Sequence, residues 1–459
     1  MDPAMGGPCQ GIRNSIPSFQ QLGYETEVVC LDPPEIRYGV DDPFVIHRLG
    51  VSRGPWAYSA KLIPWFRNHL LQYHVVIIHG LWLFPSYAVT REIASLRKAE
   101  AKRLLKKWLA SNDTNLNYTL CGNALATGLT TMSEANGAAA NADRLAQSVH
   151  VEPAKRIETN LPRFFVMPHG MLDPWFQRDS SRRFKAIRNW FVWKLVERHT
   201  IAQADGVFFT CQQELELAKQ TFRPYQPKRE INVGYGVIEP SVRTPDMDAA
   251  FHATTPELNG RPYLLFLSRI HPKKGVDLLL KAYANVAFRS AKVESGSSLF
   301  AEQKATMVVP DLVVAGPIDS EYARRMISMA KELGLSDRVH FPGMLSGDAK
   351  WGAFYGCEAF VLPSHQENFG IAVAEALACS KPVLISNQVN IWREIESSGA
   401  GIVAEDTEQG TYQLLERWGA MPGLEKESIG LKARACYRQH FDILKSTQRM
   451  ANALSGVTQ

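Results

Sequence analysis

The sequence predicts an α/β fold built from two doubly wound, Rossmann-like domains. In both halves of the chain, short apolar runs alternate with helical stretches, and this alternation is typical of parallel sheets covered by helices. Residues 241–260, between the halves, are rich in Pro, Ala, Thr and Asp, as expected of a linker. A chain of 459 residues is also long enough to bury more than one core.

The second half, residues 261–440, is expected to form one complete doubly wound domain. Its apolar runs are short and bounded by turn residues, which favours buried parallel strands over helices. The expected strands are Tyr263–Leu267, Asp311–Ala315, Arg338–Phe341, Ala359–Leu362 and Val383–Ile385.

The first half, residues 1–240, has a similar pattern that is interrupted by an insertion at about residues 101–161. The core of that insertion, residues 115–146, is dominated by Ala, Asn, Thr, Gly and Ser, so we expect disorder, with a lid over a binding site as the alternative. The expected strands are Thr26–Leu31, Val75–Ile78, Arg163–Met167, Gly206–Phe209 and Glu230–Val233. The expected helices are Ala57–Gln72, Ser86–Leu109, Arg182–Ala202 and Gln212–Thr221.

Composition excludes some classes of protein. A net charge of +5 and a sequence pI near 8.7 are too weakly basic to argue for nucleic acid, although they suit an acidic ligand or an anionic membrane. The seven cysteines are widely spaced and include no C-x-x-C pair, which indicates reduced thiols. No apolar run approaches the roughly 18 to 20 residues of a spanning helix, and no signal peptide is recognisable. We therefore expect a cytoplasmic protein that is at most peripheral on the inner face of the membrane.

The most informative segment is Ser364–Glu375, where two carboxylates flank the expected start of a helix. The backbone amides of Phe369 and Gly370 would lie at the positive end of that helix, which favours a phosphate. Glu375 would lie roughly 7 to 8 Å further along the helix axis. That spacing could place a ribose at Glu375 and a sugar at Glu367, on the two sides of a diphosphate. Two glutamates at this spacing also arise by chance.

The wider pattern Pro363-Ser364-x-x-Glu367-x-Phe369-Gly370-x4-Glu375-Ala376 resembles the donor-site signature of family 4-type retaining glycosyltransferases. The resemblance implies the GT-B fold, in which two Rossmann-like domains face a cleft. It also implies transfer of a sugar from a nucleotide-diphosphate donor to a glycan or lipid-linked hydroxyl acceptor, with no cofactor. The backbone of Asn368 to Ile371 would cap the phosphates. The last helical stretch, in residues 441–459, would pack back on the first domain.

The segment from Ser268 to Asp277 follows an expected strand and opens a helix. By the same resemblance, Arg269 and Lys274 would hold the donor diphosphate, whose negative charge must be neutralised as the glycosidic bond breaks. The alternative is a solvated basic turn.

Several glycines are expected at the nucleotide. Gly316 and Gly343 end two strands of the same sheet, where backbone can approach a ligand closely. Gly343 and Met344 match the position that contacts the base, whereas Gly316 could equally be a plain turn residue. Gly6 and Gly7 would contact phosphate from the first domain.

The chain opens with a motif, Asp2-Pro3-x-x-Gly6-Gly7, that resembles the loop after the first strand of the first domain, yet no strand precedes it. That strand, normally central, is apparently missing, which would leave unpaired amides in the sheet. We expect that the natural start lies upstream.

Two histidines follow expected strands of the first half. His169 stands in Pro168-His169-Gly170-Met171-Leu172-Asp173-Pro174-Trp175, which resembles a segment of polysaccharide-building members of the family, and we assign it a contact with donor or acceptor. His79 is a second, weaker candidate. His365 is expected to be incidental.

No residues are assigned to a metal. Asp246-Met247-Asp248 matches the D-x-D pattern of a metal site, but it lies in the expected linker and no expected strand precedes it. We therefore expect a metal-independent enzyme.

Residues 182–194 mix basic and aromatic side chains. They could lie on an anionic membrane. The interpretation we favour is that these residues form a domain helix with its aromatic face in the core and its basic face in solvent. Lys98, Lys102, Arg103, Lys106 and Lys107 form a similar candidate.

Two other functions stay open. The apparently missing strand favours a non-catalytic nucleotide-sugar-binding protein. The GT-B fold would also suit a phosphorylase, a hydrolase or an epimerase, although no pyridoxal-binding lysine segment is recognisable.

Overall fold

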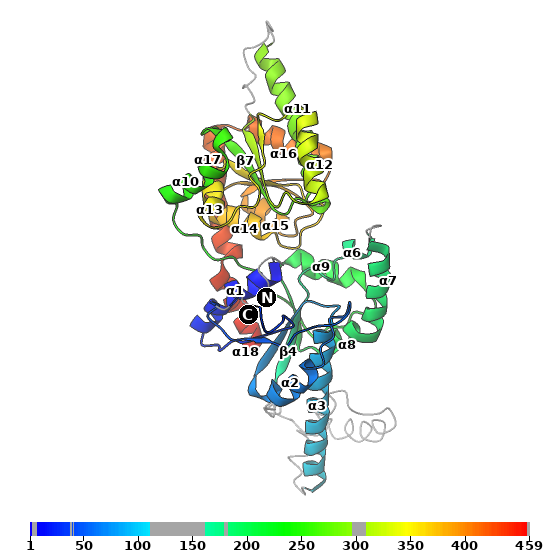
Figure 1. Cartoon of the computed structure of the whole chain (residues 1–459). Helices are drawn as coiled ribbons and strands as arrows, with labels where there is room; N and C mark the ends of the chain where they lie inside the picture. The colour runs from blue at the N-terminus through cyan, green and yellow to red at the C-terminus, as the bar shows by residue number, and fades with distance from the viewer. Residues whose placement is uncertain are drawn as a thin grey trace, which may run out of the picture.

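In the computed structural model the chain forms two α/β domains, one above the other in Figure 1. The structure describes residues 7–36, 41–110, 161–178, 182–295 and 309–456, together with residues 1 and 39. The predicted insertion beyond residue 110 and the predicted phosphate contact Gly6 lie outside the described residues.

The second domain is built on six parallel strands in the order β12-β11-β10-β7-β8-β9. These are β7 (Tyr263–Leu267), β8 (Asp311–Ala315), β9 (Val339–His340), β10 (Ala359–Leu362), β11 (Val383–Ser386) and β12 (Gly401–Ala404). The side chains of β8, β10 and β11 are buried throughout, as their continuous apolar sequences predict. The sequence prediction omitted β12.

Helices cover both faces of this sheet (Figure 1). They are η6 (Pro272–Lys274), α11 (Val276–Ser295), α12 (Glu321–Glu332), α13 (Gly347–Gly356), α14 (Ile371–Ala378), α15 (Trp392–Ser398), α16 (Glu408–Ala420) and α17 (Gly423–Cys436). Local sequence starts several of them. Ser320 and Thr407, for example, accept hydrogen bonds from the amides of Ala323 and Gly410, as helix N-caps do.

The strands of the first domain are divided between two parallel sheets. β1 (Val28–Cys30) pairs with β2 (Ile46–Arg48), and a separate sheet has the order β3 (Val75–His79), β4 (Arg163–Met167), β5 (Gly206–Phe209) and β6 (Glu230–Asn232). Among the described residues no strand precedes α1, and β3 is an edge strand. No strand pairing in the described ranges joins the two sheets.

The helices of the first domain are α1 (Gly7–Gln21), α2 (Leu62–His69), η2 (Leu70–Gln72), α3 (Phe84–Ala110), α6 (Trp175–Arg178), α7 (Arg183–Val192), η4 (Trp193–Glu197), α8 (Arg198–Gln203) and α9 (Gln212–Thr221). The helix predicted over residues 182–202 is therefore two α-helices joined by the short π-helix η4.

The strand β4 contributes to two hydrophobic cores, because successive side chains of a strand point to opposite faces. Phe164 and Val166 of β4 accordingly pack in one core, and Phe165 and Met167 pack in another.

The chain crosses between the domains twice, and the two crossings run side by side. The amide of Val237 donates to the carbonyl of Phe441, which ends η7 (Tyr437–Phe441). The last helix, α18 (Ile443–Ser455), then packs on α1 and on the core of the first domain, so both marked ends of the chain lie in that domain (Figure 1). The residues interpreted as a linker contain α10 (Pro245–Thr254) and η5 (Pro256–Leu258). Thr244 caps α10, and α10 packs on α13.

Candidate functional site

On the second domain, Lys274 and Glu367 contact each other where the chain leaves β7 and β10. Pro272 starts the short helix η6, and Gly275 ends it with a φ of +67°. A Cβ on Gly275 would lie 2.1 Å from the carbonyl oxygen of Pro363, so only glycine lets the two strand ends approach this closely. The sequence prediction named both Lys274 and Glu367, and the fold brings them into direct contact.

The lysine of this pair is buried. Burial first, and then the like charges of Lys273 and Arg269, lower the pKa of Lys274 to about 7. Arg269 itself is exposed. Like charges that repel one another form a site for an anionic group, because such a group would relieve their repulsion.

Glu367 is held in extended backbone next to the loop after β11. Its amide donates to the carbonyl of Gln388, and its carbonyl accepts from the amide of Asn390, each at 2.9 Å. Gly370, with a φ of +79°, then turns the chain into α14, which starts at Ile371. The predicted helix start between the two glutamates is therefore present.

The second glutamate of the motif is paired with a lysine. Glu375 lies in α14 and accepts a hydrogen bond of 2.6 Å from Lys350 of α13. Burial raises the pKa of Glu375, and Lys350 opposes this effect. Sequence reasoning did not find Lys350, because it is 25 residues away and no local pattern links it to Glu375.

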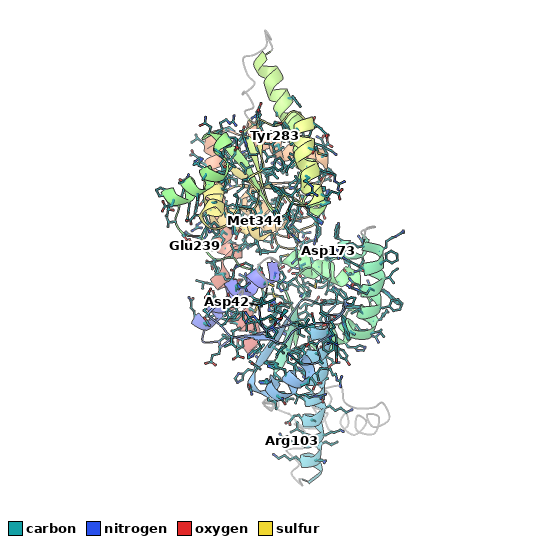
Figure 2. All side chains as sticks on the ribbon, in the orientation of Figure 1. Asp42, Arg103, Asp173, Glu239, Tyr283 and Met344 are labelled. Carbon is teal, nitrogen blue, oxygen red and sulfur yellow. The ribbon has the colours of Figure 1, made fainter. Side chains whose placement is uncertain are left out.

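The predicted glycines lie at two neighbouring strand ends. Gly316 follows β8, and its amide donates to the carbonyl of Gly343 at 2.8 Å. A Cβ on Gly316 would lie 2.0 Å from the carbonyl oxygen of Ser268, so this position requires glycine. Gly343 has a φ of +80° and open space around it. Met344 next to it is exposed on the edge of the second domain that faces the first (Figure 2).

On the first domain, His169 and His79 form a hydrogen-bonded pair, with 2.9 Å between Nε2 of His169 and Nδ1 of His79. They lie just after β4 and at the end of β3, two strands that pair in register. Burial and then the neighbouring His79 lower the pKa of His169. Although part of its surface reaches solvent, His79 is densely surrounded by protein, and the lost hydration lowers its pKa to about 4. Both imidazoles are therefore neutral at pH 7, which suits hydrogen bonds to hydroxyl groups.

A buried carboxylate fixes the turn that carries His169. His169 and Gly170 both have positive φ, at +52° and +78°. Glu214 of α9 accepts hydrogen bonds from the amide of Gly170 and from the amide and hydroxyl of Thr210, at 2.5, 2.7 and 2.5 Å. Sequence reasoning missed Glu214 and Thr210. The available signal was that Thr210 follows β5, which ends at the same sheet edge as β3 and β4.

The two halves of the site contact each other. Asn368 donates to the hydroxyl of Thr210 at 3.1 Å. The ring of Tyr235 packs 5.0 Å from Phe369 and 6.1 Å from His169, and its hydroxyl donates to the carbonyl of Gly7. Gly7, His169 and the Asn368–Phe369 segment thus surround one tyrosine that the sequence analysis did not single out.

Other residues considered from the sequence lie elsewhere. His365 pairs with Asp406. Asp248 lies in α10 and pairs with Arg243. In the described ranges, no group of three or more His, Cys, Asp and Glu could hold a metal ion. Among those same residues, no helix has the length and apolar character needed to cross a membrane.

Part of the chain, mostly in the second domain, is similar to known proteins. Residues 248–413 match the family described as glycosyl transferases group 1. The chain is 29% identical over 214 residues to a D-inositol 3-phosphate glycosyltransferase of Rhodococcus opacus, and 30% identical over 165 residues to one of Streptomyces bingchenggensis. These matches cover 46% and 35% of this chain, and 44% and 34% of the relatives, so the chain matches less than half the length of either.

Solved structures extend the likeness to the whole fold. Sucrose-phosphate synthase from Thermosynechococcus elongatus has a TM-score of 0.60 at 16% identity, covering 98% of this chain and 94% of that one. A glycosyltransferase from Rickettsia africae has a TM-score of 0.59 at 13% identity, covering 97% and 93%. At these identities the likeness shows the fold alone. Residues 248–413 therefore resemble the glycosyl transferases group 1 family, and the two domains have the GT-B fold.

Proposed function

We propose that the protein is a retaining glycosyltransferase that moves a sugar from a nucleotide-diphosphate sugar to a hydroxyl acceptor. The observation that carries this proposal is the meeting of two sites at Tyr235. The ion pair of Lys274 and Glu367 belongs to one domain, and the neutral pair of His79 and His169 belongs to the other.

Each residue has a role that its surroundings support. Lys274 and Arg269 would bind the diphosphate and stabilise the charge that grows on it as the glycosidic bond breaks. The backbone from Asn368 to Ile371 would cap the phosphates at the start of α14. These groups supply the positive charge that a metal ion would otherwise supply, so we propose that the reaction needs neither a metal nor a cofactor.

The remaining side chains suit hydroxyl groups. Glu367 would accept hydrogen bonds from the donor sugar, and Glu375 from the ribose. His169 would contact the sugar from the first domain. Retention needs no covalent protein nucleophile if the departing phosphate accepts the proton of the acceptor hydroxyl on the face that it leaves. The protein then contributes orientation and electrostatics. An acceptor in cell-surface polysaccharide or glycolipid assembly is part of the proposal.

A panel of nucleotide-diphosphate sugars tests the proposal without knowledge of the acceptor. Calorimetry reports donor binding, and proton NMR of the sugar released to water reports its anomeric configuration before mutarotation. We expect the sugar to be released slowly from the donor, with the anomeric configuration that it had in the donor. Lys274→Ala should lower the rate about 100-fold or more, as loss of a transition-state contact does.

The control is Lys426→Ala, which removes the lysine of another Lys–Glu pair in the same domain, with Glu358. It should leave the rate unchanged. Binding without turnover would favour the non-catalytic sugar-binding protein. Turnover that requires inorganic phosphate, or that converts the donor to another nucleotide-sugar, would favour a phosphorylase or an epimerase. An inverted configuration would contradict retention.

A second proposal concerns α7, whose exposed face corrects the interpretation that we favoured from sequence. The aromatic face does not pack in the core. The side chains of Phe184, Ile187, Phe191 and Leu195 are 90%, 57%, 54% and 73% exposed, and Trp190 is half exposed. Only Trp193 of the aromatic residues in residues 182–194 is buried. We call Phe184, Ile187, Phe191 and Leu195 the α7 stripe, because residues at these spacings share one helix face.

The charge around the α7 stripe favours an anionic bilayer as its partner. Residues 182–198 include six basic side chains and one acidic one, Glu197, which is buried. Each basic residue near an anionic surface contributes about 1 kcal/mol, and an apolar stripe can insert between headgroups. We therefore propose that α7 holds the enzyme on the inner membrane face, where lipid-linked acceptors would be reached.

Vesicle flotation tests this contact. The protein should float with phosphatidylcholine vesicles that contain phosphatidylglycerol, and far less with phosphatidylcholine alone. Phe191→Ser should weaken flotation several-fold because it removes an apolar anchor. Phe288→Ser in α11 is a matched control, since Phe288 is also 54% exposed. Equal loss in both variants, or no flotation of the unaltered protein, would contradict the proposal.

A further inference from the structure

A cavity of about 380 Å³ lies between the two domains, beside the proposed donor site. Asp173, which lines it, lies on the edge of the first domain that meets the second (Figure 2). The cavity is rich in carboxamide side chains from both domains, namely Gln213, Gln220, Gln366, Asn387, Gln388 and Asn390. None of these residues has a role in the proposed chemistry.

Gln366, which lines this cavity, has a buried side-chain acceptor without a partner in the described ranges. Its side chain is 3% exposed, and its Nε2 donates to Oδ2 of Asp173 at 2.9 Å. The carboxylate accepts and cannot donate, so the amide orientation is fixed and Oε1 must point elsewhere. Oε1 has no hydrogen-bond partner among the described residues, and neither does the buried Oε1 of Gln213. A buried acceptor without a donor is destabilising, and a small rotation of the Gln366 side chain would let a ligand hydroxyl in the cavity satisfy it.

The rest of the lining narrows the class of ligand. Trp175 and Trp392 provide apolar surface, and the exposed Arg178 and Arg393 provide positive charge. Arg393 pairs weakly with Glu216, at 3.9 Å between two half-exposed side chains, and its guanidinium lies 4.8 Å from the centre of the Trp392 ring. Carboxamides that both donate and accept, together with aromatic surface, suit a sugar. The arginines add a preference for a carboxylate or a phosphate.

The cavity and the donor site lie on opposite sides of one backbone segment. Gln366 and Glu367 are consecutive, and the backbone at Glu367 pairs with Val389 as in a strand. Successive side chains of an extended segment point to opposite sides, and Gln366 indeed contacts Asp173 while Glu367 contacts Lys274. A ligand that contacts both domains at Gln366 would therefore support the segment that carries Glu367, on the side opposite the donor site.

We propose that this cavity binds an anionic saccharide unit of the acceptor. That the ligand belongs to the acceptor rests on the proposed function, whereas the class of ligand rests on the cavity alone.

Saturation-transfer NMR with three probes tests the inference: D-glucuronate, D-glucose 6-phosphate and neutral D-glucose. At least one anionic probe should bind more tightly than glucose, and whichever does so identifies a carboxylate or a phosphate as the preferred group. The double variant Arg178→Gln/Arg393→Gln should weaken anionic binding at least tenfold. Both side chains are exposed, so the variant should fold, and its melting temperature checks this.

Arg324→Gln, an exposed arginine on α12, is the control and should bind like the unaltered protein. Absence of anionic binding, or equal binding by the double variant, would overturn the inference. Donor binding, measured separately with the nucleotide-sugar panel, should be unchanged in the double variant. If no donor binds but the arginine-dependent binding persists, the cavity assignment stands and the proposed transferase function fails.

Discussion

Lys274 is the residue whose charge state should control donor binding. Because burial lowers its pKa to about 7, its ammonium is charged below that pH and increasingly neutral above it. A diphosphate binds the charged form, so donor affinity should fall as the pH rises from 6 to 9. Calorimetric titration with a nucleotide-sugar at several pH values measures this.

Lys274→Arg provides the comparison, because arginine stays charged throughout that range. Its donor affinity should be less dependent on pH than that of the unaltered protein, even if its geometry is poorer. The same decline with pH in both proteins would assign the titration to another group.

At the scale of elements, the short π-helix η4 ends in a buried carboxylate of the first domain, Glu197. Glu197 accepts hydrogen bonds from the amide of Trp82 and the hydroxyl of Ser86, at 2.7 and 2.8 Å, next to the start of α3. Its second oxygen has no partner among the described residues. Burial raises the pKa of Glu197 from 4.5 to about 7, so the folded state binds this proton more tightly than the unfolded chain.

The stabilisation by that proton is complete below pH 4.5 and is lost as the pH rises through 7, by at most about 3 kcal/mol. Glu197→Gln keeps an uncharged acceptor and should remove this loss. The melting temperature of the variant relative to the unaltered protein should therefore be higher at pH 8 than at pH 5. Glu216→Gln, on the exposed side of α9, should show no such trend.

At the scale of the whole molecule, the donor segment is held against the first domain through Thr210. Its hydroxyl donates to Glu214 and accepts from Asn368 across the domain boundary. Thr210→Val keeps the shape but removes both bonds. Because closed domains favour the donor, donor affinity should fall about five- to 150-fold, as loss of a buried hydrogen bond of about 1–3 kcal/mol implies. Calorimetry measures it.

Thr200→Val separates closure from stability. Thr200 is also buried in the first domain and bonds to Thr90, within the domain. Both variants should lower the melting temperature, and only Thr210→Val should weaken donor binding. Equal donor affinity in the two would show that this contact does not hold the domains closed.

Elements and site residues differed in how well the sequence predicted them. The bounds of β7, β8, β10, β4 and β5 match the prediction, because each is a short apolar run between turn residues. β2 and β12 were omitted, since both are short and partly exposed. Of the site, sequence named Lys274, Glu367 and His169, but not Lys350, Glu214 or Tyr235, which act through contacts that only the folded chain forms.

The sequence by itself determined the two α/β domains and the donor-side motif, because periodicity and local turn chemistry act over a few residues. Only the tertiary structure decided which side chains meet. It paired His79 with His169, joined Asn368 to Thr210 and turned the α7 stripe towards solvent. The physical reason is that strand ends far apart in the chain converge at one sheet edge, whereas the burial of a helix face depends on what packs against it.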